Sequence, residues 1–106
     1  MADALMQCYE RMAAASERML SAARAEDWNA LLAAEADYTA LVERVRDSAA
    51  GRLLGAAEAR RKQEIIRRVL ADDAEIRSCL QPWLARLEAL LVSAGQAHRL
   101  RQSYGS

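Results

Sequence analysis

Side chains that carry out chemistry are few in this chain of 106 residues, and they are widely separated. Cys8, Cys79 and the single histidine, His98, do not lie near one another in sequence, so no nucleophile–base pair has local support. The two cysteines match no zinc spacing, and the Glu-x-x-His pairs of di-iron bundles are missing. The sequence therefore predicts that the protein is not an enzyme and holds no metal and no cofactor.

Haem is the one cofactor whose ligands the sequence suggests. Some small four-helix cytochromes hold haem between a methionine near the start and a histidine near the end, and Met6 and His98 occupy such places. However, the Cys-x-x-Cys-His attachment motif is missing, and His98 follows Gly95, where the helical pattern weakens. We therefore expect no haem.

The charge balance also narrows the function. Fifteen basic and fifteen acidic residues give a formal net charge of zero, which does not support direct binding of nucleic acid. No apolar run approaches the ~20 residues that a membrane span needs, so we expect no membrane insertion. Asp3, Glu10 and Arg11 interrupt any signal peptide. These features predict a cytoplasmic protein.

The composition favours an all-α fold. The chain has 24 alanines and 14 leucines but only four glycines and one proline, and β-branched residues are few. Apolar residues recur at three- and four-residue spacing in four segments, which predicts helices over about 3–24, 27–47, 56–80 and 82–94. We expect a single domain over 1–106, folded as an antiparallel four-helix bundle, with a disordered tail over 98–106.

The apolar stripes of the second and third predicted helices are wide. A wide stripe packs against two neighbours at once or leaves a groove for a partner helix, and the pattern leaves both interpretations open. If there is a groove, the candidate partner-binding residues are Leu31, Leu32, Tyr38, Leu41, Val42, Ile65, Ile66, Val69, Leu70 and Ile76.

Pro82 is the only proline, and it lies between the last two predicted helices. Proline lacks a backbone N–H and has a fixed φ, so it begins a helix well and interrupts one badly. We expect one helix to end near Leu80 and a hinged one to begin at Pro82. If this last helix covers the groove in the absence of a partner, the gating residues are Pro82, Trp83, Leu84, Leu87 and Leu91.

Two charged clusters on the third predicted helix have two interpretations each. Its first half holds a basic cluster of Arg60, Arg61, Lys62, Arg67 and Arg68. Its second half holds the acidic residues Asp72, Asp73 and Glu75, for which Arg77 and Arg86 are candidate partners. Each cluster is either a solvated surface with internal ion pairs or a contact surface for another protein.

Several short passages occur in a recognisable order. Glu26-Asp27-Trp28-Asn29-Ala30-Leu31 opens the second predicted helix, and Leu-Val-Glu-Arg-Val at 41–45 lies near its end. Ile65-Ile66, Leu70, Asp73-Ala74-Glu75-Ile76-Arg77 and Gln81-Pro82-Trp83-Leu84 follow. Over roughly residues 10–92 this order resembles the FliT family of flagellar type III export chaperones. The 51–55 segment departs from the family, which often starts its third helix with a capped, proline-containing turn.

The resemblance implies a chaperone for the filament-cap protein FliD. Such chaperones bind the aggregation-prone C-terminal segment of the cap protein and deliver it to the export ATPase complex. In some bacteria they also bind the master flagellar transcriptional regulator. The alternative is a structural or assembly four-helix bundle without a cargo groove. Whether the chain is a monomer or a homodimer stays open at this point.

Overall fold

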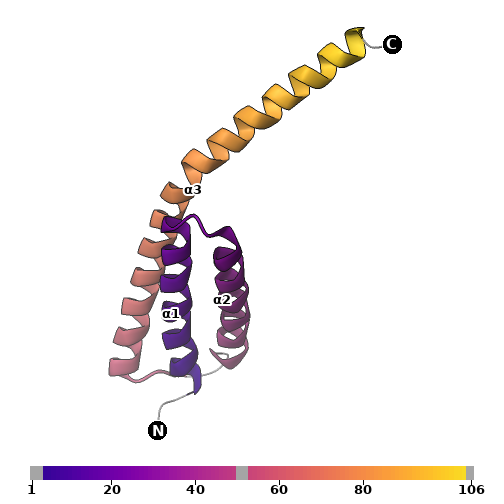
Figure 1. The fold of residues 1–106 in the computed structure, drawn as a ribbon. Helices are drawn as coiled ribbons and strands as arrows, with labels where there is room; N and C mark the ends of the chain where they lie inside the picture. Colours follow the sequence, from indigo (N-terminus) through magenta and orange to yellow (C-terminus); the bar gives the residue numbers. More distant parts are fainter. Residues whose placement is uncertain (1–3, 50–52, 105–106) are drawn as a thin grey trace.

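The computed structural model describes residues 4–49 and 53–104, which form three helices (Figure 1). They are α1 (Ala4–Arg24), α2 (Trp28–Ala49) and α3 (Ala56–Tyr104). Helices and short connections account for all of the described residues, so the all-α prediction is confirmed. Asp3, at which the first helix was expected to begin, and residues 50–52 of the second connection lie outside the described residues.

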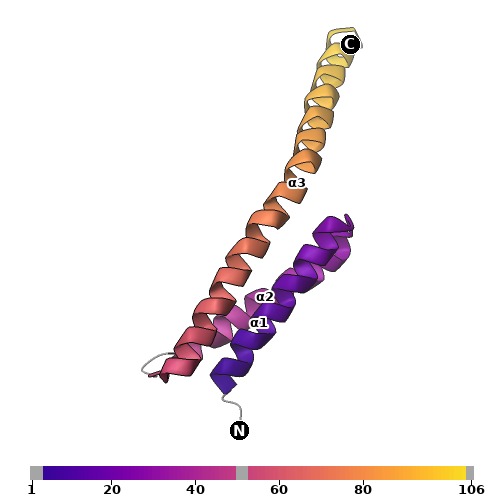
Figure 2. The ribbon, with the colours of Figure 1, turned by 90° about the vertical axis from the view of Figure 1, so that its left-hand side faces the viewer.

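The helix α1 is the centre of the bundle. It packs against both α2 and α3, whereas no Cα atom of α2 lies within 8 Å of one in α3 among the described residues. Figures 1 and 2 show α2 antiparallel to α1, and α3 beginning at the same end as α1. Because α1 separates the backbones of α2 and α3, one face of the bundle is open between them.

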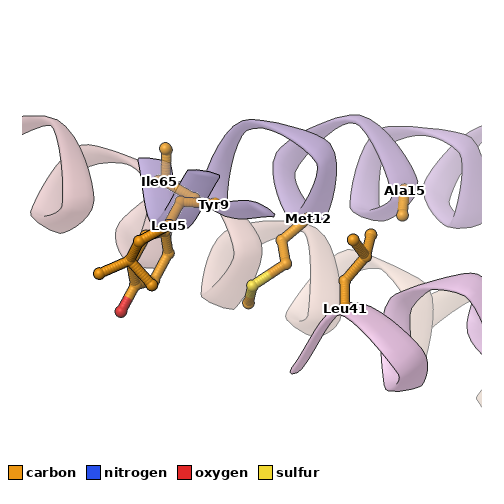
Figure 3. Packing of buried hydrophobic residues seen from close by; sticks show 6 residues of the cluster. All are labelled: Leu5, Tyr9, Met12, Ala15, Leu41 and Ile65. Carbon is orange, nitrogen blue, oxygen red and sulfur yellow. The ribbon is translucent and has the colours of Figure 1, made fainter. Parts of the chain in front are cut away.

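The core follows the stripe on α1. Leu5, Tyr9, Met12 and Ala15 of α1 cluster with Leu41 of α2 and Ile65 of α3, all of them buried (Figure 3). Figure 3 shows Leu41 reaching from α2 toward Met12 and Ala15. A second cluster, made of Leu20, Ala23 and Ile76, lies nearer the other end of α1. The three- and four-residue spacing of α1 therefore builds the core, as expected from the sequence.

Local hydrogen bonds explain the tight connection between α1 and α2. Glu26 has a φ of 56°, and its N–H donates to the carbonyl of Ala23 while the N–H of Asp27 donates to that of Ala22. This is the Schellman pattern that ends many helices. The Asp27 carboxylate then accepts a 3.1 Å hydrogen bond from the N–H of Ala30, which caps the N-terminus of α2.

One polar pair is buried where α1 meets α3. The Ser16 hydroxyl donates a 2.8 Å hydrogen bond to Asp72, which also accepts one of 3.3 Å from Arg68. Ser16 and Asp72 are 3% and 4% exposed. A buried carboxylate without partners is costly, so these bonds favour the one register of α3 on α1 that satisfies it. Asp72 is thus a structural residue and not a surface contact.

The prediction that one helix ends near Leu80 and another begins at Pro82 is wrong. The helix α3 is continuous over 49 residues with Pro82 inside it, so the described chain has three helices where four were expected. Proline removes the hydrogen bond to the carbonyl of Ser78, four residues earlier. Both residues are exposed, so water can bond that carbonyl in place of the missing N–H. Figure 1 shows α3 bending near its middle, which is where a proline kink is expected.

The last third of α3 projects away from the bundle. The molecule measures 71 × 24 × 18 Å, and its radius of gyration is 20.4 Å, against the ~13 Å of a compact chain of this length. The helix continues through Gly95 to Tyr104, so the disordered tail expected over 98–106 is helical as far as the structure describes it. Residues 105–106 lie outside the described residues.

Candidate functional site

The open face of the bundle contains an apolar groove of about 240 Å³ between α2 and α3. We call it the α2–α3 groove. The helix α1 forms its floor, Tyr38 of α2 one wall, and α3 the other wall. Its lining residues are Ser16, Met19, Tyr38, Val69, Leu70, Asp73 and Ile76.

The groove exists because α2 and α3 each pack on α1 while their own backbones stay more than 8 Å apart. The stripes on both helices are wider than contact with α1 requires, so part of each stripe remains uncovered. Leu70 shows this most clearly, because it lines the groove with 63% of its surface exposed. An uncovered leucine in a groove is typical of a helix-docking surface.

The predicted partner-binding residues separate into three groups. Leu41 and Ile65 are 9% and 1% exposed in the main core cluster, and Ile76 is 6% exposed where the groove meets the second cluster. Their first role is therefore to hold the helices together.

The groove itself contains four of the ten predicted residues. Tyr38, Val69 and Leu70 line it together with Ile76. Tyr38 and Val69 are half-buried and pack partly against the core.

The remaining four predicted residues do not line the groove. Leu31, Val42 and Ile66 are half-buried, and Ile66 lies one turn before Leu70 on α3. Leu32 is 65% exposed.

Sequence reasoning missed three lining residues. Ser16 and Met19 belong to α1, where the helical pattern does not distinguish a residue under a groove from one under a helix. Asp73 was considered only as part of an acidic cluster. Its spacing of four from Val69 and three from Leu70 places it on the same helix face, which was the available signal.

The three acidic residues of that cluster have different environments. Asp72 is buried in the contact with α1 described above. Asp73 pairs with Arg77 at 3.0 Å, one of the two partners expected from the sequence. Glu75 pairs with Arg24 at the end of α1. The other expected partner, Arg86, instead lies 3.7 Å from Glu26.

The pKa of Tyr38 is affected by its position in the groove wall. Partial burial raises the pKa of its phenol above the ordinary value, and the negative charge of Asp73 raises it further. Asp73 and Tyr38 belong to opposite walls. The field of the Asp73 carboxylate therefore extends over the groove between them.

A second contact joins the start of α2 to the middle of α3. The rings of Trp28 and Trp83 lie 5.4 Å apart between centroids, and Arg86 reaches Glu26 beside them. Of the predicted gating residues, Trp83 is half-buried here and Leu87 is 36% exposed. Pro82, Leu84 and Leu91 are exposed, the two leucines at 52% and 65%. In this structure the gating residues therefore lie outside the groove.

The basic cluster at the start of α3 is partly paired. Arg61 donates hydrogen bonds of 2.6 and 2.8 Å to Glu10 of α1 and one of 3.1 Å to Glu64. The hydrogen bonds from Arg61 lower the pKa of Glu10, although its slight desolvation opposes the shift. These exposed pairs contribute little to stability.

The described residues contain no cluster of three His, Cys, Asp or Glu side chains that could hold a metal ion. Cys8 and Cys79 are half-buried free thiols. Over the ranges 4–49 and 53–104, no helix is both long and apolar enough to cross a membrane. The α2–α3 groove is the candidate site because its apolar lining and the exposed Leu70 suit contact with another apolar surface.

The sequence and the fold are similar to those of known proteins. The sequence profile described as "Flagellar protein FliT" matches residues 6–106. The flagellar protein FliT of Photorhabdus laumondii is 31% identical over 101 residues, which cover 95% of this chain and 81% of the relative. That of Yersinia pestis is 27% identical, with 95% and 84% covered. The crystal structure of flagellar protein FliT from Bordetella bronchiseptica superposes with a TM-score of 0.76 at 35% identity, covering 83% of this chain and 99% of that one.

Proposed function

Because this chain belongs to the FliT family of flagellar proteins, we propose that it is a cytoplasmic type III export chaperone for the filament-cap protein FliD. In this proposal the chain binds the C-terminal segment of the cap protein and delivers it to the export apparatus. The export ATPase complex and the master flagellar transcriptional regulator are the further partners that it includes.

The observation that carries the proposal is the α2–α3 groove. A helix laid along it would contact all three helices of the bundle and complete a fourth position around α1. The exposed Leu70 and the half-buried Val69 offer apolar area to such a helix. Burying a leucine-sized side chain contributes about 1.5–3 kcal/mol, so several contacts of this kind offset much of the entropy that association costs.

The direct test is a calorimetric titration of the full chain with a synthetic peptide of the cap protein's C-terminal segment. We expect saturable binding with a negative heat-capacity change, because apolar surface is buried. A peptide of the same composition in scrambled order is the control, since it lacks the amphipathic stripe. Equal binding of both peptides, or of neither, would contradict the chaperone proposal.

We also propose that the projecting part of α3 competes with cargo for the groove. It carries an apolar strip, Leu84, Leu87, Leu90 and Leu91, which is exposed in this structure. Pro82 lies before the strip and removes one helix hydrogen bond, which weakens α3 at this point. If the strip covers the groove for part of the time, the apparent affinity for cargo equals the affinity of the open groove multiplied by the fraction of time that it is open.

Removing residues 87–106 tests this competition. The shortened chain keeps the Trp28–Trp83 contact and the Arg86–Glu26 pair, so its melting temperature should change by no more than a few degrees. We expect the cap peptide to bind at least about 2-fold more tightly, as the open fraction rises toward one. Unchanged affinity in a chain that melts normally would exclude competition, and loss of cooperative melting would show that the strip stabilises the bundle.

A further inference from the structure

One charged side chain lines the otherwise apolar and neutral α2–α3 groove. Asp73 is that residue among the described lining residues, and Val69, Leu70 and Ile76 surround it on α3. Its side chain is 50% exposed, unlike that of the neighbouring Asp72, which is bonded inside the core. A carboxylate at the edge of an apolar surface favours a partner that brings a cation to it.

The existing partner of Asp73 leaves room for another. Arg77 pairs with it from one turn further along the same helix, but the arginine side chain is 77% exposed. A pair on the surface of one helix contributes little, because water screens it and two long side chains lose freedom. A cation from a docked helix would meet the carboxylate with the groove partly closed to water, where the interaction is stronger.

A second acidic residue, Glu35, lies on α2 close to the Tyr38 wall. Glu35 lies three residues before Tyr38 on α2, so both are on one face of that helix. It is exposed, and it accepts a 3.2 Å hydrogen bond from Thr39 on the same helix. The negative charge of Asp73 also acts on Tyr38 from across the groove. Glu35 therefore adds negative charge near the groove, although it does not line it.

We propose that the α2–α3 groove selects an amphipathic helix with a lysine or arginine beside its apolar stripe. The apolar residues cover Leu70 and Val69, and the cation pairs with Asp73. This inference rests on the proposed function, because it specifies the chemistry of the cargo at the same site. Asp73 sets specificity in it, whereas the apolar lining supplies most of the affinity.

Two designed helical peptides test the selection without relying on the identity of the cargo. They share one apolar stripe and differ in the flanking residues, which are lysine in one and glutamate in the other. We expect the lysine peptide to bind the full chain at least about 10-fold more tightly at low salt, and the preference to shrink as salt screens the pair. Equal binding of the two peptides, or binding of neither, would overturn the inference.

Two matched variants locate the effect. Asp73→Asn keeps the shape of the side chain and should abolish most of the preference for lysine. Asp37→Asn is the control, because Asp37 is also exposed and ion-paired, with Arg18 at 3.3 Å, but does not line the groove. The control should retain the full preference. If Asp73→Asn kept the preference as well, another charge would be responsible and the assignment would be wrong.

The cap-protein peptide separates this inference from the proposed function. A peptide whose basic residues are replaced by glutamine completes a double-mutant cycle with Asp73→Asn. Coupling between the two changes supports both proposals. If the cap peptide binds but the two changes are not coupled, the chaperone proposal stands and Asp73 does not set specificity. If the cap peptide does not bind but the lysine peptide is still preferred, the groove selects basic helices as inferred, but the cap protein is not its cargo.

Discussion

Replacing Ile65 with alanine is expected to lower the free energy of unfolding by about 2–5 kcal/mol. Ile65 is 1% exposed and belongs to the cluster that joins all three helices. The cavity left by the lost methyl and methylene groups cannot close without moving α1 or α2. A domain of this size has about 5–15 kcal/mol of stability in total, so the melting temperature should fall by about 10 °C or more.

The adjacent isoleucine provides the matched control. Ile66 is half-buried and is not part of the core cluster, so Ile66→Ala should cost less than half as much. Thermal melts followed by circular dichroism measure both variants under one condition. If the two variants melted together, Ile65 would not be the core residue that its burial indicates, and the division of the stripe into core and groove would be wrong.

The sequence predicted α1 better than the other helices, for a physical reason. Both flanks of α1 are covered, so almost every apolar residue in its stripe is buried, and spacing alone identifies them. The capping aspartate of α2 was likewise readable, because its hydrogen bond forms within three residues. Local rules succeed where the determinants of structure are local.

The stripe on α3 could not be resolved from the sequence in this way. A helical pattern gives the same weight to Ile65, Ile66, Val69 and Leu70. Their exposed fractions nevertheless range from 1% for Ile65 to 63% for Leu70. The difference depends on which side of α3 meets α1 and on the absence of a neighbour on the other side. Periodicity defines a face, but the number of helices that pack on it is a property of the tertiary structure.

Pro82 is a second case in which a local rule did not predict the structure. The rule that proline interrupts helices assumes that the lost hydrogen bond and the steric clash are not compensated. Here Ser78 and Pro82 are exposed, whereas Cys79 and Leu80 between them are half-buried against the second cluster. The helix therefore bends and continues. The residue type alone thus predicted a helix end that the structure does not have.

Replacing Leu70 with aspartate is expected to weaken binding of the cap-protein peptide by about 10- to 100-fold without unfolding the chain. The side chain is 63% exposed, so the free protein loses little packing when it is replaced. In a complex the leucine would be covered, and its burial contributes about 1.5–3 kcal/mol, at 1.4 kcal/mol for each tenfold change in affinity.

Leu32→Asp is the matched control for this variant, because it separates a groove effect from general loss of surface apolarity. Leu32 is 65% exposed, almost the same as Leu70, but it belongs to α2 and does not line the groove. Titration of both variants with the same peptide, after melts confirm that they fold, gives the comparison. Selective loss with Leu70→Asp assigns cargo to the groove. Equal losses in both variants would indicate that the binding surface includes the exposed side of α2. Unchanged binding in both would indicate that cargo binds the projecting part of α3.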